Sequence, residues 1–266
     1  IEIEHCNFSN VSTYSNQTNE TTMDLTLAKT IEGFSEYIKF INPDLIVVHG
    51  DRVEALAGAI VGSLNNILVA HIEGGEVSGT IDELIRHSIS KMSHLHYVSN
   101  TDAQKRLIQM GEMESSIRVI GSPDVDIMFS KNLPSIEEVK KYYEIPYKNY
   151  GIVMFHSVTT EYKKMKEYIE NLVNALLEDS RYYVVIYPNN DLGTKFILNE
   201  YKRLENNSRF RIIPSLRFEY FLILLKNSKF IIGNSSTGIR EAPYYGIPTI
   251  NIGTRQENRS LHSHIL

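Results

Sequence analysis

Two stretches decide the fold of this chain: Val48-His49-Gly50-Asp51-Arg52 and His71-Ile72-Glu73-Gly74-Gly75-Glu76. Each follows a short aliphatic run, at residues 45–48 and 67–70 respectively. Such a run is typical of a buried parallel strand, and ligands of open α/β sheets bind just past the carboxyl ends of these strands. Two strand ends that each carry a histidine and a carboxylate predict a polar site, although capping of the next helix explains either end alone equally well.

Strand-like and helix-like segments alternate along the whole chain. In the first half we expect strands at 44–49, 67–71, 96–99 and 117–120, and helices at 22–41, 52–64, 81–93 and 101–111. In the second half we expect strands at 151–155, 182–187, 210–213, 230–232 and 248–250, and helices at 162–177, 194–204, 218–227 and 237–245. Thr80 and Glu83 form the pattern of a capping box. The alternation predicts an α/β fold of two Rossmann-like domains, with parallel sheets that face a cleft.

One segment interrupts the alternation. Residues 131–150 are charged and rich in tyrosine, and they contain Pro134 and Pro146. We therefore expect an N-terminal domain at 1–130, a linker at 131–150 and a C-terminal domain at 151–266. The chain begins without Met and stops soon after an apparent strand, so we expect it to be part of a longer polypeptide.

The composition excludes several classes of protein. The formal net charge is −5 and no basic patch stands out, which argues against a nucleic-acid partner. Cys6 is the single cysteine, so a disulfide framework and a Cys-rich zinc site are excluded, and a reducing cytoplasm is the expected location. No apolar run reaches the roughly 18–20 residues of a membrane helix and no signal-peptide pattern opens the chain, so we expect no membrane partner.

Three carboxylates follow strands of the first domain: Asp51, Glu73 and Asp82. Acid/base chemistry needs carboxylates whose pKa values are pushed apart by burial and neighbours, and three at one sheet edge can supply them. Asp82 and Arg86 are four residues apart on a predicted helix, and a surface salt bridge is the simpler interpretation of that spacing.

The second domain offers a histidine and a Gly/Ser/Thr turn. His156 follows the strand 151–155, although a single histidine is as often structural. The turn Gly233-Asn234-Ser235-Ser236-Thr237-Gly238 leads a strand into a helix, and free N–H groups there favour an anion such as phosphate. Ordinary helix capping by Ser235 or Ser236 explains the turn as well, and it matches neither a Walker loop nor a dinucleotide fingerprint. Histidines 87, 94 and 96 match no zinc signature, so no metal is expected.

Several motifs occur in a fixed order along the chain. They are His49-Gly50-Asp51-Arg52, the run from His71 to Asp82, Arg86-His87, His156 with Val158-Thr159-Thr160, Tyr187-Pro188-Asn189, Gly233-Asn234-Ser235-Ser236 and Gly253-Thr254-Arg255-Gln256. Together they resemble the UDP-N-acetylglucosamine 2-epimerases, and most closely the hydrolysing branch that begins sialic acid synthesis. The resemblance covers nearly all of 43–259 and implies the glycosyltransferase-B arrangement, with UDP held in the cleft.

The resemblance also implies roles for particular residues. Catalytic roles fall to Asp51 and Glu73 as acid/base groups, to Asp82 with Arg86 beside it, and to His156, a diphosphate contact that helps UDP leave. The UDP-binding residues implied are Ser235 and Ser236 at phosphate, Glu241 at the ribose, Phe221 near the uracil, and Asn189 and Arg255 near the nucleotide. The assignment of acid and base among the three carboxylates stays open.

Three departures from the family pattern stand out. The opening strand with its Gly-Thr-Arg-like loop is absent from the sequence, and so is the closing helix. Relatives commonly have proline after the second-domain histidine, where this chain has Ser157, which we expect to loosen the turn and leave the imidazole in place.

The implied reaction releases UDP and N-acetylmannosamine through a 2-acetamidoglucal, with no cofactor, in a homodimer or homotetramer. The nearest alternative is the hydrolysing 2-epimerase of a UDP-2,4-diacetamido-trideoxyhexose, on the route to legionaminic-type acids. A non-hydrolysing epimerase is a further alternative, which the loop 73–80 argues against. In a glycosyltransferase or a nucleotide-sugar sensor of the same architecture, Asp51 and Glu73 would be dispensable.

Overall fold

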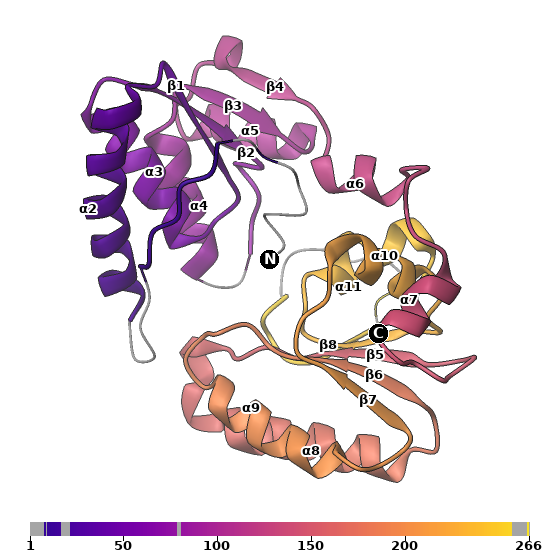
Figure 1. Cartoon of the computed structure of the whole chain (residues 1–266). Helices are drawn as coiled ribbons and strands as arrows, with labels where there is room; N and C mark the ends of the chain where they lie inside the picture. Colours follow the sequence, from indigo (N-terminus) through magenta and orange to yellow (C-terminus); the bar gives the residue numbers. More distant parts are fainter. Residues whose placement is uncertain (1–7, 9, 17–21, 79–80, 257–264, 266) are drawn as a thin grey trace. The chain divides into compact units, whose positions relative to one another are not determined.

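The computed structural model describes residues 8, 10–16, 22–78, 81–256 and 265 (Figure 1). The chain divides into two compact units, the first comprising Ile1–Val77 with Ile81–Pro123 and the second Ser78–Thr80 with Asp124–Leu266. Each unit contains one sheet whose strands are all parallel. The predicted α/β class with two Rossmann-like parallel sheets is confirmed.

The first unit is a four-stranded sheet with helices packed on it. The strands are β1 (Leu45–His49), β2 (Leu68–Ile72), β3 (Leu95–Val98) and β4 (Ile117–Val119), in that spatial order. The helices are α2 (Met23–Ile41), α3 (Val53–Leu64), α4 (Ile81–Lys91) and α5 (Thr101–Gln109), with a 3₁₀ turn at Glu114–Ser116. Helices α2, α3 and α4 lie next to one another and bury their apolar side chains against β1 and β2 (Figure 1).

Strand β1 is buried on only one of its faces within the part of the chain that the structure describes. Ile46 and Val48 are 7% exposed and face α3, whereas Leu45 and Val47 are 42% and 57% exposed. The strand also lies at the edge of its sheet, beside β2. The uninterrupted aliphatic run therefore marks a strand, as predicted, and among the described residues this strand is covered on one face.

The second unit has five strands, and the order of its sheet reverses. Its strands are β5 (Gly151–Met154), β6 (Tyr183–Ile186), β7 (Phe210–Ile213), β8 (Ile231–Gly233) and β9 (Thr249–Asn251), arranged β7-β6-β5-β8-β9. Its helices are α6 (Pro123–Met128), α7 (Ile136–Tyr142), α8 (Met165–Glu178), α9 (Thr194–Tyr201), α10 (Phe218–Lys226) and α11 (Thr237–Arg240). Three 3₁₀ turns lie at Thr159–Lys164, Lys202–Leu204 and Ala242–Tyr245. Because the chain proceeds outward from β5 in one direction and from β8 in the other, the switch point between them is where an open α/β sheet binds its ligand.

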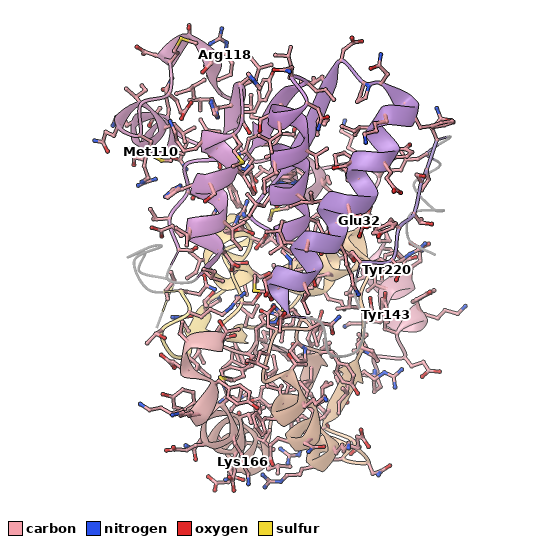
Figure 2. The ribbon with its side chains drawn as sticks, turned by 90° about the vertical axis from the view of Figure 1, so that its left-hand side faces the viewer. Glu32, Met110, Arg118, Tyr143, Lys166 and Tyr220 are labelled. Carbon is pink, nitrogen blue, oxygen red and sulfur yellow. The ribbon has the colours of Figure 1, made fainter. Side chains whose placement is uncertain are left out.

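Residues 131–150, expected as an inter-domain segment, pack into the core of the second unit. Helix α7 begins with a capping box made by Ser135 and Glu138, and Val139 on this helix is fully buried. The Tyr150 hydroxyl donates to the Leu224 carbonyl at 2.8 Å. Tyr143 packs edge-on against Tyr220 of α10, with ring centroids 5.9 Å apart (Figure 2). These contacts assign the segment to the second unit.

Two further features of the predicted elements differ from the structure. The helix expected over 237–245 is α11 followed by a 3₁₀ turn, because Pro243 has no N–H to continue the helical hydrogen bonds. The capping box at Thr80 and Glu83 lies outside the described residues. Among the helices that are described, none has the length and apolar character required to cross a membrane.

Candidate active site

The first group of candidate residues, which we call the carboxylate group, consists of Asp51 after β1, Glu73 after β2, and Asp82 and Arg86 on α4. Neighbouring strands pair Val48 with His71 and His49 with Ile72, so the residues after them emerge at one edge of the sheet. Asp82 is partly buried in the first turn of α4. The parallel register therefore explains why the polar residues that follow β1 and β2 lie at the same edge of the sheet.

Arg86 is a buried residue and does not lie at the surface, as the interpretation of its spacing from Asp82 had placed it. It is 3% exposed, and its guanidinium donates to the Asp51 carboxylate. Its Nη1 also donates to the Glu76 carbonyl at 2.9 Å. A buried guanidinium needs an anionic partner and filled hydrogen bonds, so Arg86 fixes the orientation of Asp51 relative to the loop that carries Glu73.

The Glu73 side chain is 6% exposed and is held at both carboxylate oxygens. The Ser122 hydroxyl donates to Oε1 at 2.6 Å, and His49 Nε2 lies 3.1 Å from Oε2. The backbone of Glu73 is left-handed, with φ of 64°, and its N–H donates to the Tyr97 carbonyl. Non-glycine residues adopt this conformation at a cost and often do so at functional sites. The arrangement gives a mostly buried carboxylate with a defined direction.

The loop after Glu73 packs closely against α5, and this contact requires glycine at position 75. Gly75 has φ of 78°, and a Cβ at this position would lie 2.5 Å from the Ala103 carbonyl oxygen of α5. The Glu76 carboxylate accepts hydrogen bonds from Ser99 at 2.9 Å and from Asn100 at 2.8 Å, next to the same helix. The loop is therefore fixed against α5 on one side of Glu73.

His71, the first residue of the second motif, is a core residue. It is fully buried, with Nε2 2.8 Å from the Gly50 carbonyl and Nδ1 3.0 Å from Ser90 Oγ. Burial lowers the pKa of His71 to about 4, so the ring is neutral at physiological pH. Nε2 donates to Gly50 and Nδ1 accepts from Ser90, which joins the end of β1 to β2 and α4. Its role is to support the carboxylate group.

In the second unit, His156 lies at the switch point, where β5 ends beside β8. Gly233, the last residue of β8, has φ of +142°, and a Cβ there would lie 1.9 Å from the Met154 carbonyl oxygen. Only glycine allows β8 to pass this close to β5. The next residue, Asn234, then comes within reach of His156.

Asn234 belongs to the motif Gly233-Asn234-Ser235-Ser236, but nothing in the sequence indicated its role. Its side chain accepts a hydrogen bond from the His156 N–H at 2.7 Å and donates to the His156 carbonyl at 2.8 Å. Its own carbonyl accepts from Arg255 Nη1 at 3.2 Å and from Gln256 Nε2 at 2.9 Å. Asn234 is 1% exposed and connects three loops. We call His156, Asn189, Asn234, Ser235, Ser236 and Arg255 the switch-point group.

The environment of His156 keeps its ring neutral. The Asn189 N–H donates to His156 Nδ1 at 3.1 Å. Burial, and after it the charge of Arg255, lower the pKa of His156 to about 3. The Asn189 carbonyl accepts from the Thr194 hydroxyl at 2.7 Å, which holds this loop in place.

The remaining predicted residues have less distinctive surroundings. Ser235 is buried and its hydroxyl accepts from the Thr237 N–H at 3.3 Å, so it caps the turn, while Ser236 is partly buried. Burial raises the pKa of Glu241, one of whose oxygens has no hydrogen-bond partner among the described residues. Phe221 on α10 is 7% exposed and packs at the margin of the core of the second unit.

The three histidines beyond these groups have separate protein neighbours. His87 lies 4.0 Å from Glu83, His94 Nδ1 accepts from the Val69 N–H at 3.1 Å, and His96 is buried 3.4 Å from a Glu112 oxygen. No cluster of histidine, cysteine and acidic side chains suited to a metal ion occurs in the described ranges.

Two Rossmann-like units, one carrying the carboxylate group and the other the switch-point group, define a two-unit α/β enzyme. The family model described as UDP-N-acetylglucosamine 2-epimerase matches residues 3–266. The chain belongs to this UDP-N-acetylglucosamine 2-epimerase family.

Two relatives illustrate the range within this family. Over all of its residues the chain is 52% identical to a UDP-N-acetylglucosamine 2-epimerase of Neisseria meningitidis, of which it covers 70%. It is 34% identical to the UDP-N,N'-diacetylbacillosamine 2-epimerase (hydrolyzing) of Legionella pneumophila, over 88% of the chain and 62% of that protein.

The fold agrees with a solved structure. The chain superposes with a TM-score of 0.75 on the crystal structure of Methanocaldococcus jannaschii UDP-GlcNAc 2-epimerase in complex with UDP-GlcNAc and UDP. The sequence identity is 23%, over 90% of this chain and 68% of that one. At this identity the likeness concerns the fold.

Proposed function

We propose that the protein is a hydrolysing UDP-N-acetylglucosamine 2-epimerase, which converts its substrate and water into N-acetylmannosamine and UDP for sialic acid synthesis. The observation that carries the proposal is the carboxylate group in a member of this family. Two oriented carboxylates, Asp51 held by Arg86 and Glu73 held by His49 and Ser122, follow adjacent strands. A reaction that moves a proton at carbon needs such groups.

The proposed reaction has two steps, elimination of UDP and addition of water. A carboxylate removes the proton from C2 of the sugar, the electron pair forms the C1–C2 double bond, and the C1–O bond breaks with its electrons passing to the β-phosphate of UDP. Water then adds across the double bond of the resulting 2-acetamidoglucal. The hydroxyl goes to C1, and a proton is delivered to C2 on the face opposite to the one from which the first proton was removed, which inverts that centre.

The two groups of residues divide this chemistry between them. The C2–H beside an acetamido group is weakly acidic, so base strength and stabilisation of the departing diphosphate must both contribute. We assign proton transfer to Asp51 and Glu73, with Asp82 and Arg86 as further catalytic residues. We assign the diphosphate to His156, Ser235, Ser236 and Arg255. Asn189, Phe221 and Glu241 complete the nucleotide contacts that we propose.

The choice of sugar rests on relatedness. The higher identity to the N. meningitidis relative than to the L. pneumophila relative favours UDP-N-acetylglucosamine over a diacetamido sugar. The word "hydrolyzing" in the name of the L. pneumophila protein supports release of the free sugar in this part of the family.

The experiment is NMR of the complete protein in deuterated water with each UDP-sugar. We expect free N-acetylmannosamine with deuterium at C2, together with UDP. Turnover of the diacetamido sugar alone would select the alternative substrate, and intact UDP-N-acetylmannosamine would show a non-hydrolysing enzyme. Glu73→Gln and Asp51→Asn should each lower the rate by at least about a hundredfold. Unchanged rates in both variants would contradict the epimerase mechanism and favour a glycosyltransferase or a sensor.

We also propose that the protein works in the cytoplasm as a homodimer or homotetramer. The single cysteine supports a reducing compartment, and the family resemblance supports self-association. Light scattering coupled to gel filtration of the complete protein measures the mass directly, and a monomer at micromolar concentration would contradict the second point.

A further inference from the structure

We propose that His156 contacts the diphosphate of UDP as a neutral hydrogen-bond donor through Nε2–H, and that Asn234 is the positioning residue that holds it in this state. The inference rests on the proposed function for the identity of the ligand.

The hydrogen-bond pattern determines which ring nitrogen carries the hydrogen. A neutral imidazole has one donor nitrogen and one acceptor nitrogen. The Asn189 N–H points at Nδ1 from 3.1 Å, within the usual range for such a bond, so Nδ1 is the acceptor. Nε2 therefore carries the hydrogen. Among the described residues no protein group is bonded to Nε2, which is left to donate to a ligand.

The surroundings oppose a charged ring. His156 is partly buried, and the guanidinium of Arg255 is the charged group whose field acts on its ring. Both effects lower the pKa of His156, to about 3 in the ligand-free protein. A bound diphosphate acts in the opposite direction through its negative charge. The protonation state must therefore be measured with UDP present.

Asn234 bonds to both residues that we propose as diphosphate contacts, His156 and Arg255. Its amide bonds to the N–H and the carbonyl of His156, which sets the backbone from which the imidazole projects. Its carbonyl accepts from Arg255, the cation of the same group. With these bonds made, positive charge comes from Arg255 and a directed neutral hydrogen bond comes from His156. No proton has to be taken up when the anion binds.

Calorimetry measures proton uptake directly. UDP is titrated into the complete protein at pH 8, where the terminal phosphate of UDP is already fully ionised, in two buffers that differ in ionisation enthalpy. After the heat of dilution is subtracted, we expect the same heat of binding in both buffers, which means that no net proton is taken up. Uptake of close to one proton that disappears in His156→Gln would overturn the proposal, because the proton would then reside on the imidazole.

The tautomer is observed separately by ¹⁵N NMR of the histidine rings, assigned by the loss of a signal in His156→Gln. We expect His156 to be the neutral Nε2–H form from pH 6 to pH 8, both without ligand and with UDP. An imidazolium at pH 7 with UDP, or the Nδ1–H form, would overturn it. Because this measurement needs no turnover, failure of the epimerase assay leaves it intact and points to the proposed function instead.

The positioning role of Asn234 is tested by substitution. Asn234→Ala should weaken UDP binding about tenfold and convert the His156 signal into a mixture of tautomers. Asn234→Asp keeps the oxygen that accepts from His156 N–H and covers the case in which the alanine variant does not fold. Asn227→Ala is the matched control, since Asn227 also donates to a main-chain carbonyl, that of Ile223, but lies at the C-terminal cap of α10. Wild-type UDP affinity and an unchanged His156 signal in a folded Asn234 variant would contradict the role.

Discussion

At the scale of the residue, two histidines that follow apolar runs of the sequence have different surroundings. His71 and His156 both lose their charge because burial disfavours an imidazolium. His71 spends both ring nitrogens on Gly50 and Ser90 inside the first unit. His156 uses one nitrogen on Asn189. Both histidines follow an apolar run in the sequence, so the structure alone separates the fully buried core residue, with two ring partners, from the partly buried candidate ligand contact.

His71 makes the stability of the first unit depend on pH. Its pKa is about 4 in the folded protein against 6.5 in the unfolded chain, so the unfolded chain binds more protons between these values. The stabilisation is complete above pH 6.5 and is lost as the pH falls toward 4. From pH 7 to pH 5 the free energy of unfolding should fall by about 2 kcal/mol through this residue.

Urea unfolding of the wild type and of His71→Gln at the two pH values measures this effect. Glutamine keeps a donor for the Gly50 carbonyl and cannot titrate. The fall in stability should therefore be smaller in the variant by about 2 kcal/mol. Equal pH dependence in the two proteins would show that His71 is not the titrating group.

At the scale of the element, the passage of β8 beside β5 depends on Gly233. Alanine there would combine an unfavourable φ with a Cβ 1.9 Å from the Met154 carbonyl oxygen. Gly233→Ala should destabilise the second unit by more than about 3 kcal/mol, or prevent its folding. Gly246→Ala is the matched control, because Gly246 also has positive φ, at +66°, but its Cβ would meet open space.

Thermal unfolding distinguishes the two glycine variants. Gly246→Ala should cost about 1–2 kcal/mol, the cost of the left-handed conformation alone. Similar midpoints for the two variants would show that the contact with Met154 relaxes without consequence.

The sequence predicted most elements because the determinants of an element are local. The expected strand at 182–187 and helix at 162–177 correspond to β6 and to α8 with the turn before it. The exposure of Leu45 and Val47 was not predictable, because it depends on which elements pack on the second face of the sheet. The same holds for Asn234, whose partner His156 is 78 residues away. The buried position of Arg86 was hidden because its partner Asp51 lies 35 residues back.

At the scale of the whole molecule, each unit carries one half of the proposed chemistry. Asp51→Asn in the first unit should abolish turnover and leave UDP affinity within about twofold, since UDP is assigned to the second unit. Arg255→Ala should weaken UDP binding about tenfold or more, because it removes the cation from the switch-point group. Lys166→Ala, a charge change at an exposed position of α8, is the control (Figure 2). Titration calorimetry measures the UDP affinity of all three variants. Loss of UDP binding in Asp51→Asn would contradict this division between the two units.

Because the backbone at Glu73 is left-handed, we expect selection for stability and selection for activity to favour different residues at this position. At φ of 64° glycine and asparagine are easier to accommodate than glutamate, so folding alone prefers them at this position. In a library varied at position 73 and sorted only for resistance to protease, glycine and asparagine should become common. The same library sorted for release of N-acetylmannosamine should return glutamate. Under the catalytic role that we propose for Glu73, position 73 keeps activity at the expense of stability, and an inactive but more stable variant is one substitution away.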